Sequence, residues 1–382
     1  MIVKVAGNIL SPLGLTTDEN FAQIMAKRSA IRRYEGVRGI PEPFAASLFE
    51  DGVLDTLFAK ESRDTATAYT LFEKALILSI QRALAESAGT DPSSERVMFI
   101  ISTTKGNVDL LGNPAGFDPE RAYLGAAASA VSRYFGNPNR PVVVSNACAS
   151  GACAQLAAWR YINSGICDTA IVAGADIQSQ FIVTGFQSFK ALSPEGCRPF
   201  DSERCGLNPG EAAATIIYTR RSEVAADDWV LVKGAIRNDA NHISGPSRTG
   251  EGCYRALQQI LQGEERERIA VINAHGTATN YNDEMESIAL ARAGLLGIPV
   301  NSLKGYYGHT MGAAGILETL LTQRALESDT VLGTRGFRTH GVSEPITVTG
   351  EHRQSRKRQF IKMLSGFGGC NAALLFKQGG EL

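Results

Sequence analysis

One cysteine stands in a segment whose composition suits covalent chemistry. Cys148 lies in VSNACASGACAQ, where a β-branched run gives way to small residues and then to a helical pattern. Small neighbours permit a tight strand–turn–helix connection that presents a nucleophile at a helix N-terminus, where the helix dipole favours a thiolate. Most free cysteines are inert core residues, so packing and catalysis both remain open for this segment alone. Cys153, one turn further on, is expected to pack in the core.

Two histidines follow in loops rich in glycine and threonine. His275 stands in NAHGTATNYNDEMES after an apolar strand pattern, and His309 stands in SLKGYYGHTMGAAG before a helical pattern. A single histidine is more often structural than functional, but two of only five in such loops support one another. Cys148 and these histidines could also bind zinc. No short-spaced ligand pair supports a metal site, and none is predicted.

The strand patterns around these side chains are almost continuously apolar and alternate with helical patterns. This predicts an α/β protein whose strands are covered on both faces. Two strand patterns, PVVVSNA and IAVINAH, each end in Asn-Ala, directly before Cys148 and at His275. Open α/β sheets place sites at the carboxyl ends of strands, so two such edges facing one another would form one site from two halves. Strands are expected at 2–7, 97–102, 141–147, 169–175, 213–219, 229–236, 269–275, 346–350, 359–365 and 372–376, and helices at 65–88, 149–164, 252–262, 283–294 and 312–327.

The composition narrows the class of protein. The chain has 382 residues, 44% of them hydrophobic, and 38 Lys+Arg against 39 Asp+Glu, so nucleic-acid binding is not expected. Seven cysteines without a Cys-x-x-Cys pair indicate no disulfide framework and favour the cytoplasm. The N-terminus does not resemble a signal peptide, and no apolar run is long enough to predict a membrane span.

Four ordered motifs resemble those of the β-ketoacyl-acyl-carrier-protein synthases of the elongating Cys-His-His type. They are SNACASG, NAHGTAT with Asp283 and Glu286 downstream, SLKGYYGHTMGAAG and SGFGGCN. The segment RPFDSERCGLNPGEAAA (198–214) and the N-terminal SPLG also match, so the resemblance extends over almost the whole chain. It implies a thiolase-like fold, with two similar α/β halves in a layered αβαβα arrangement. The polar stretch 220–228 would separate a nucleophile half, 1–222, from a histidine half, 223–382.

The resemblance also implies an activity without a cofactor. The enzyme would be an acyltransferase (EC 2.3.1.-) that condenses an acyl group on Cys148 with malonyl-acyl-carrier-protein. The product would be 3-oxoacyl-acyl-carrier-protein in fatty acid or polyketide elongation. His275 and His309 would stabilise the enolate that decarboxylation leaves. Phe367, in SGFGGCN, would gate Cys148, and the backbone N–H groups of both would form an oxyanion hole.

Supporting roles follow from the same resemblance. Lys304 would be a buried support for the second histidine, paired with Glu286. The run from Asp283 to Glu286 also fits a capping box that starts a helix, and both roles can coexist. Thr277 and Thr279 would bind the phosphopantetheine arm, with strand-end capping as the alternative. SGFGGCN is not a phosphate loop, because a strand pattern rather than a helix follows it.

The resemblance implies a carrier protein and a second subunit as partners. Lys60, Arg63 and Arg198 are candidates for carrier docking, with ordinary surface charge as the alternative. The segment between 103–107 and Cys148 is shorter than the family leads us to expect, which leaves the chain-length preference open. An obligate dimer is expected, either a homodimer or a pair with a related subunit, with the apolar strand 171–176 at the interface.

Two alternative functions are considered. A thiolase acting on coenzyme A thioesters would use a second cysteine as its base, and Cys370 stands in the Phe367 loop. The Cys-His-His pattern and the lack of Cys-x-Gly-Gly-Gly argue against this activity. A non-catalytic chain-length factor would lack the nucleophile, whereas Cys148 is present.

Overall fold

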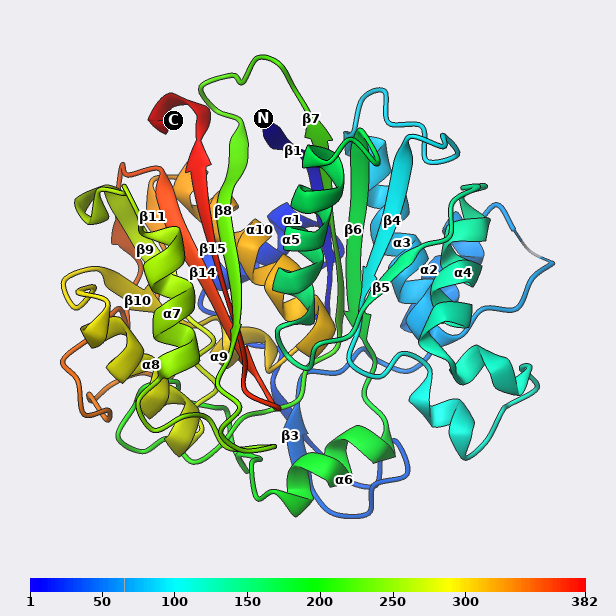
Figure 1. Ribbon diagram of the computed structural model, residues 1–382. Coiled ribbons are helices and arrows are strands. Elements are labelled where there is room, and N and C mark those ends of the chain that lie inside the picture. The colour runs from blue at the N-terminus through cyan, green and yellow to red at the C-terminus, as the bar shows by residue number, and fades with distance from the viewer. Residues whose placement is uncertain (65) are drawn as a thin grey trace.

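The computed structural model describes residues 1–64 and 66–382 (Figure 1). The strands are β1 (Ile2–Leu10), β2 (Arg32–Tyr34), β3 (Phe44–Ala46), β4 (Val97–Ser102), β5 (Val142–Val144), β6 (Thr169–Asp176), β7 (Ala212–Arg220), β8 (Trp229–Asn238), β9 (Ile269–Asn273), β10 (Pro299–Asn301), β11 (Thr330–Val331), β12 (Thr347–Val348), β13 (Arg353–Gln354), β14 (Gln359–Gly366) and β15 (Cys370–Gln378). The α-helices are α1 (Thr17–Met25), α2 (Val53–Glu61), α3 (Leu71–Glu86), α4 (Leu124–Tyr134), α5 (Ser150–Asn163), α6 (Gln180–Ser188), α7 (Glu251–Ile260), α8 (Asn280–Arg292), α9 (Lys304–Tyr307) and α10 (Ala314–Glu327).

Two sets of strands with the same order form the centre of the protein. The N-terminal sheet runs β5-β4-β6-β7-β1, and the C-terminal sheet runs β10-β9-β14-β15-β8, with β12 added beside β10. In each set the order is the third, second, fourth, fifth and first strand along the chain. A single residue pair between β1 and β8, Val3 with Val230, joins the two sheets. The two similar halves that the resemblance implied are therefore confirmed.

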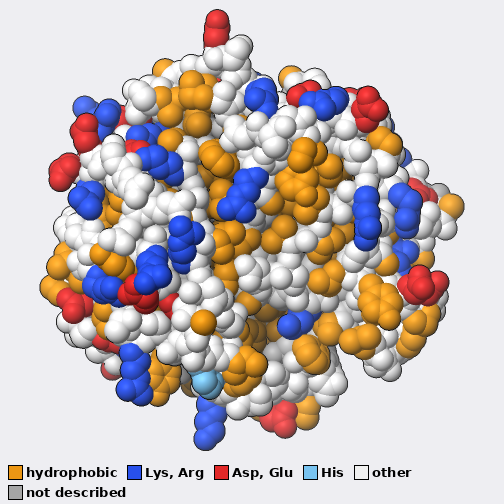
Figure 2. All heavy atoms as spheres, in the orientation of Figure 1, with side chains coloured by type: hydrophobic (Ala, Val, Ile, Leu, Met, Phe, Trp, Pro, Cys, Tyr) orange, Lys and Arg blue, Asp and Glu red, His pale blue; other side chains and the backbone are white. Residues whose placement is uncertain are grey.

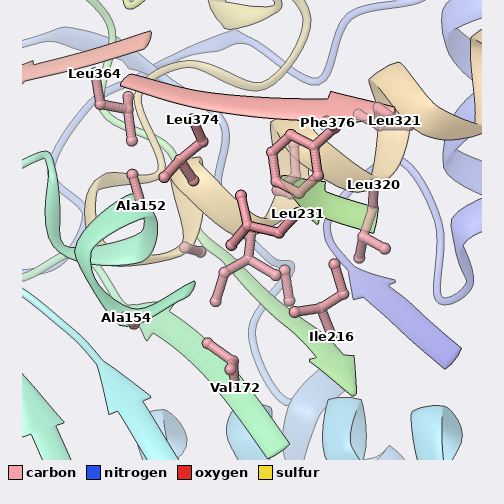
Figure 3. Packing of buried hydrophobic residues seen from close by; sticks show 14 of the residues in the cluster. Ala152, Ala154, Val172, Ile216, Leu231, Leu320, Leu321, Leu364, Leu374 and Phe376 are labelled. Atoms are coloured by element: carbon pink, nitrogen blue, oxygen red, sulfur yellow. The ribbon is translucent and has the colours of Figure 1, made fainter. Parts of the chain in front are cut away.

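Helices cover both sheets and also fill the space between them (Figure 1). Helices α2, α3 and α4 pack on the outer face of the N-terminal sheet, and α7 and α8 pack on the outer face of the C-terminal sheet. Helices α5 and α10 lie between the sheets, where Val172 of β6, Leu231 of β8 and Leu320 of α10 point toward one another (Figure 3). The layers are thus αβαβα, as expected.

The burial pattern explains why the strands lack clear polar alternation. In β6, Ala170 and Val172 face the middle layer, while Ile171 and Ala173 face the outer helices. Side chains with alternating directions are all buried, which produces a continuous apolar run. Helix α10 is buried on nearly all sides, since sheets enclose it from two directions.

Several expectations about elements need correction. The run 171–176 is not an edge strand, because β6 lies between β4 and β7, and the edge of the N-terminal sheet is β5. The strands before Cys148 and at His275 are not equivalent either. In order along the chain, β5 is the third strand of the N-terminal sheet, whereas β9 is the second strand of the C-terminal sheet. The helix expected at 65–88 begins at Leu71, where Thr70 and Glu73 form a capping box. Thr65 lies outside the described residues. The sequence did not predict helices α1, α2, α4, α6 and α9 or strands β2, β3, β10, β11 and β13.

No helix within residues 1–64 and 66–382 is long and apolar enough to cross a membrane.

Two glycines let α5 and α10 approach each other closely. A Cβ added at Gly315 of α10 would lie 2.6 Å from the backbone carbon of Gly151 in α5. We expect Gly315→Ala to lower the free energy of unfolding by about 1–3 kcal/mol, because backbone cannot move aside as a side chain can. Urea unfolding measures the change. The matched control is Gly297→Ala, where a Cβ meets open space. Equal stability of the two variants would contradict the close-approach argument.

Candidate active site

The cysteine lies at a strained connection between β5 and α5. Ala147 has a φ of +46°, which is unusual for a residue with a side chain. Cys148 is the next residue, and α5 begins two residues later at Ser150. A Cβ at Gly366 would lie 3.0 Å from the Ala147 Cβ and 3.1 Å from the Cys148 nitrogen. The absence of a side chain at Gly366 therefore lets the Phe367 loop pass directly beside the thiol.

The structure brings Cys148 together with both predicted histidines. The cysteine sulfur and one ring nitrogen from each of His275 and His309 all lie within 4.8 Å of one another. The two imidazole rings are 5.1 Å apart between centroids and nearly perpendicular. Cys148 comes from the N-terminal half and the histidines from the C-terminal half, so neither half contains the whole cluster.

Hydrogen bonds fix the orientation of the His309 ring. Its backbone N–H donates to the Asn208 carbonyl at 2.6 Å, and its carbonyl accepts from the Gly210 N–H at 3.0 Å. The Met311 N–H donates to Nδ1 of His309 at 3.3 Å, so Nδ1 is the acceptor and Nε2 carries the proton. Nε2 is buried without a partner in the described part of the chain. This N–H is therefore available to a ligand beside Cys148.

Two carboxylates at the start of α8 hold the His275 loop through its backbone. Glu286 accepts the N–H groups of His275 and Gly276, each at 2.7 Å. Asp283 accepts the Thr277 N–H at 3.0 Å. Burial, and then the neighbouring Asp283, raises the pKa of Glu286 to about 7. The capping box expected from Asp283 to Glu286 is wrong, because α8 already begins at Asn280 and both carboxylates serve the preceding loop.

The expected partner of Lys304 is also wrong. Its ammonium lies 2.8 Å from Oε1 of Glu318 on α10, and Glu286 is occupied by backbone donors instead. A second lysine, Lys362 of β14, lies 2.5 Å from the other oxygen of Glu318. All three side chains are almost fully buried. Although burial acts to raise it, the two ammonium groups hold the pKa of Glu318 below its usual range.

Burial controls protonation in the cluster. It raises the pKa of the Cys148 thiol to about 11, although the Lys304 ammonium acts in the opposite direction. Burial and then Lys304 lower the pKa of both His275 and His309 well below the usual value. The resting site therefore holds a thiol and two neutral imidazoles. Burial thus opposes the thiolate that the position before α5 was expected to favour.

A cavity of about 390 Å³ opens onto this cluster. Thr277 and Thr279 line it, with their hydroxyl groups 2.9 Å apart. Phe367 lies at its opening with 41% of its surface exposed. The ring packs against Phe186 and Phe189 at the end of α6, with centroids 6.1 Å and 5.4 Å away. The aromatic side chain can swing only if it leaves these contacts, which suits a gate.

Two backbone donors beside the thiol also lack partners. Within the part of the chain that the structure describes, no other residue accepts the N–H of Cys148 or of Phe367. Both residues line the cavity. A carbonyl carbon bound to the sulfur would place its oxygen near these donors, which is the arrangement of an oxyanion hole.

Some predicted residues lie away from the cluster, and some important ones were missed. Lys60 and Arg63 lie at the end of α2 and just beyond it, and Arg198 pairs with two glutamates; none of the three lines the cavity. The missed residues are Glu318 and Lys362. Their signal was a charged residue within an otherwise apolar segment, GILETLL and QFIKMLS respectively, which predicts a paired buried charge.

Comparison with known proteins agrees with this geometry. The family model for the beta-ketoacyl synthase N-terminal domain matches residues 2–224, and that for the C-terminal domain matches residues 229–338. The chain belongs to the β-ketoacyl synthase family. A relative within the family is 3-oxoacyl-[acyl-carrier-protein] synthase 2 of Rhizobium meliloti, which is 29% identical over 99% of this chain and 98% of its own.

Solved structures of β-ketoacyl synthases have the same fold. One from Burkholderia phymatum superimposes with a TM-score of 0.87 and is 25% identical, covering 99% of both chains. A ketosynthase in complex with its chain length factor, from Xenorhabdus doucetiae, gives a TM-score of 0.83 at 25% identity over 99% of this chain and 98% of the matched one.

The raised thiol pKa predicts how Cys148 reacts in the free β-ketoacyl synthase. Because only the thiolate attacks, its alkylation by iodoacetamide should accelerate about tenfold per pH unit from pH 7 to pH 9. Peptide mass spectrometry over time measures the rate, with the exposed Cys205 as an internal control for the reagent. A plateau in the Cys148 rate below pH 9 would contradict a thiol whose pKa burial raises to about 11.

Proposed function

We propose that this chain catalyses decarboxylative Claisen condensation of an acyl group on Cys148 with a malonyl group on acyl carrier protein. The product is 3-oxoacyl-acyl-carrier-protein, in fatty acid or polyketide chain elongation. The N-terminal half, 1–222, supplies the nucleophile, and the C-terminal half, 223–382, supplies the histidines. The observation that carries the proposal is one half-buried thiol within 4.8 Å of two buried imidazole nitrogens at a single cavity.

The first step is acyl transfer to the enzyme. The Cys148 sulfur attacks the carbonyl of the acyl thioester, and the backbone N–H groups of Cys148 and Phe367 stabilise the oxyanion. The carrier thiolate leaves and takes up the proton that the Cys148 thiol loses. A neutral imidazole beside the sulfur can relay that proton, since both histidines are held unprotonated.

The second step is decarboxylation followed by carbon–carbon bond formation. The malonyl thioester loses CO2, and the electron pair of the broken carbon–carbon bond forms an enolate. The enolate oxygen accepts hydrogen bonds from the Nε2–H of His309 and from His275. The enolate carbon then attacks the acyl carbonyl on Cys148, and the cysteine thiolate leaves. Each histidine donor contributes on the order of 3–4 kcal/mol to such a transition state. No metal or cofactor is needed.

The two rival functions fit the cluster less well. A thiolase-type base would need Cys370 at the reacting atoms, but this thiol is buried, is not among the cavity residues and accepts from the Asn146 amide at 2.8 Å. The neighbouring Cys153 and burial raise the pKa of Cys370, so its thiol stays protonated and cannot accept a proton from a substrate. A non-catalytic chain-length factor has no need for Cys148 and two histidines in one cavity.

The carrier protein would deliver its phosphopantetheine arm through the cavity. We propose that the hydroxyl groups of Thr277 and Thr279 bind this arm, because both line the approach to Cys148. Lys60, Arg63 and Arg198 remain proposed docking residues for an acidic carrier. The ion pairs of Arg198 with Glu195 and Glu203 already neutralise much of its charge, which makes it the weakest of the three.

We also propose that the chain works as a dimer in the cytoplasm, with itself or with a related subunit. The three residues of β5 are half-buried valines at an open sheet edge, a surface that invites pairing. Hydrophobic side chains are exposed over the middle of the face on which α5 and β5 lie (Figures 1 and 2). The related ketosynthase from Xenorhabdus doucetiae forms such a complex with its chain length factor. Seven free cysteines support a reducing compartment.

Separating the two steps tests the function. We expect His309→Ala to slow CO2 release from the malonyl substrate about 100-fold or more, because one enolate donor is lost. Acylation of Cys148 should fall much less, since the oxyanion donors are backbone groups. Single-turnover mass spectrometry of the acyl adduct and trapping of 14CO2 measure the two rates separately.

Two controls accompany this experiment. Cys148→Ala should show no acyl adduct and no condensation product, and full labelling of that variant would refute the assignment. Dialysis against EDTA should leave both steps unchanged. If His309→Ala lost both steps equally, the histidine would serve thiolate formation rather than the enolate.

The oligomeric state is a separate prediction. If the second subunit is another copy of this chain, the purified chain should sediment at twice its mass of 40.8 kDa down to low concentration, with β5 paired across a two-fold axis. If it is a related subunit, the chain should reach dimer mass and full turnover only when that subunit is added. Sedimentation velocity at several concentrations measures this, and turnover is compared with and without a candidate partner subunit. A stable, fully active monomer would contradict the dimer.

A further inference from the structure

A lysine stands in the middle of an interior strand, where the free-energy cost of a charge is high. Lys362 lies in β14 between apolar residues, and its side chain is completely buried. An ammonium group without water is stable only when carboxylates and carbonyl groups replace its hydration. The neighbours of Lys362 therefore indicate what the charge does.

One side of the ammonium contacts the end of the strand that carries His275. Lys362 Nζ lies 2.6 Å from the Asn273 side-chain oxygen and 3.3 Å from the Ala274 carbonyl. These are the last residue of β9 and the residue directly before His275. The Asn273 amide in turn donates to Asn301 of β10 at 2.8 Å, which orients the oxygen that faces Lys362.

The other side of the ammonium reaches the segment that carries His309. Lys362 Nζ is 2.5 Å from Oε2 of Glu318, and Oε1 of the same carboxylate is 2.8 Å from Lys304 Nζ. Lys304 begins the helix α9 before His309, and Glu318 lies on α10 after it. A continuous buried chain of polar atoms thus joins the two histidine segments behind the reactive nitrogens.

The charges of Lys362, Lys304 and Glu318 do not cancel. Two ammonium groups share one carboxylate, which leaves a surplus positive charge behind the imidazoles. Both histidines consequently resist protonation: burial lowers their pKa first, and the Lys304 and Lys362 charges lower it further. Burial lowers the pKa of Lys362 itself to about 8, with Glu318 of α10 opposing and Lys304 of α9 adding to the shift. Glu286 of α8 is the other acidic group that faces it.

We propose that Lys362 is a positioning residue for the decarboxylation step, which ties the His275 and His309 segments together and places a positive charge behind the enolate. This inference rests on the proposed function. Lys362 does not line the cavity and touches no substrate, so it acts through the histidines. Acyl transfer to Cys148 uses backbone donors for its oxyanion and needs only a neutral imidazole as proton relay, which burial maintains without Lys362, so it should be nearly independent of Lys362.

The variant Lys362→Met tests this role, because methionine has a similar shape and no charge. With pre-acylated enzyme, we expect CO2 release to fall at least tenfold, while acylation of Cys148 stays within threefold of the parent. The matched control is Lys4→Met, which removes another interior-strand lysine, paired with Glu327 at 3.9 Å and absent from the cavity. Both of its steps should be unchanged. Circular dichroism and thermal unfolding verify folding.

The pH profile separates positioning from a merely structural role. In the acylated parent enzyme, Cys148 cannot titrate, so CO2 release should decline above about pH 8 as Lys362 loses its proton. That decline should be absent in Lys362→Met. Any change of rate near pH 7 that comes from the titration of Glu286 should remain in both the parent and the variant. If the variant does not fold, the decline in the parent alone decides, and its absence overturns the proposal.

The other outcomes are equally distinct. Decarboxylation by Lys362→Met within threefold of the parent, or equal loss of both steps, would overturn the positioning role. A parent enzyme that forms no acyl adduct on Cys148 and releases no CO2 would instead refute the proposed function.

Discussion

Helices α5 and α10 cross between the two sheets at Gly151 and Gly315, where no side chain separates their backbones. Cys148 lies just before α5, and the His309 loop leads into α10. The close approach of these helices therefore sets the distance between Cys148 and His309. Sheets pack on both sides of the pair, so the geometry of the cluster depends on the buried middle layer of the protein.

The electrostatics of the site follow from its burial. Removing water lowers the pKa of both histidines and raises that of Cys148, which leaves neutral donors and a protonated thiol. The protein offsets the buried charge nearby with ion pairs: Glu318 sits between two lysines, and Glu286 accepts backbone N–H groups from the His275 loop. These contacts lie behind the cluster, where they hold the loops without occupying the cavity.

The duplicated topology explains why the site needs both halves. β5 and β10 are the third strands of their sheets, and the segments that follow them carry Cys148 and His309. The two segments occupy equivalent places in the two halves, although the intervening helix α9 has no counterpart before α5. Each half alone would expose its middle-layer face, so neither half is expected to form the cluster without the other.

The sequence by itself determined the α/β class, most strands, and which three side chains, Cys148, His275 and His309, form the cluster, because these depend on local apolar patterns and ordered motifs. It did not determine which strand lies at the sheet edge, since the interior β6 and the short edge β5 are both apolar runs. Nor did it pair Lys304 with Glu318, because a buried charge finds its partner across the fold rather than along the chain. Those choices belong to the tertiary structure, where packing decides which groups meet without water.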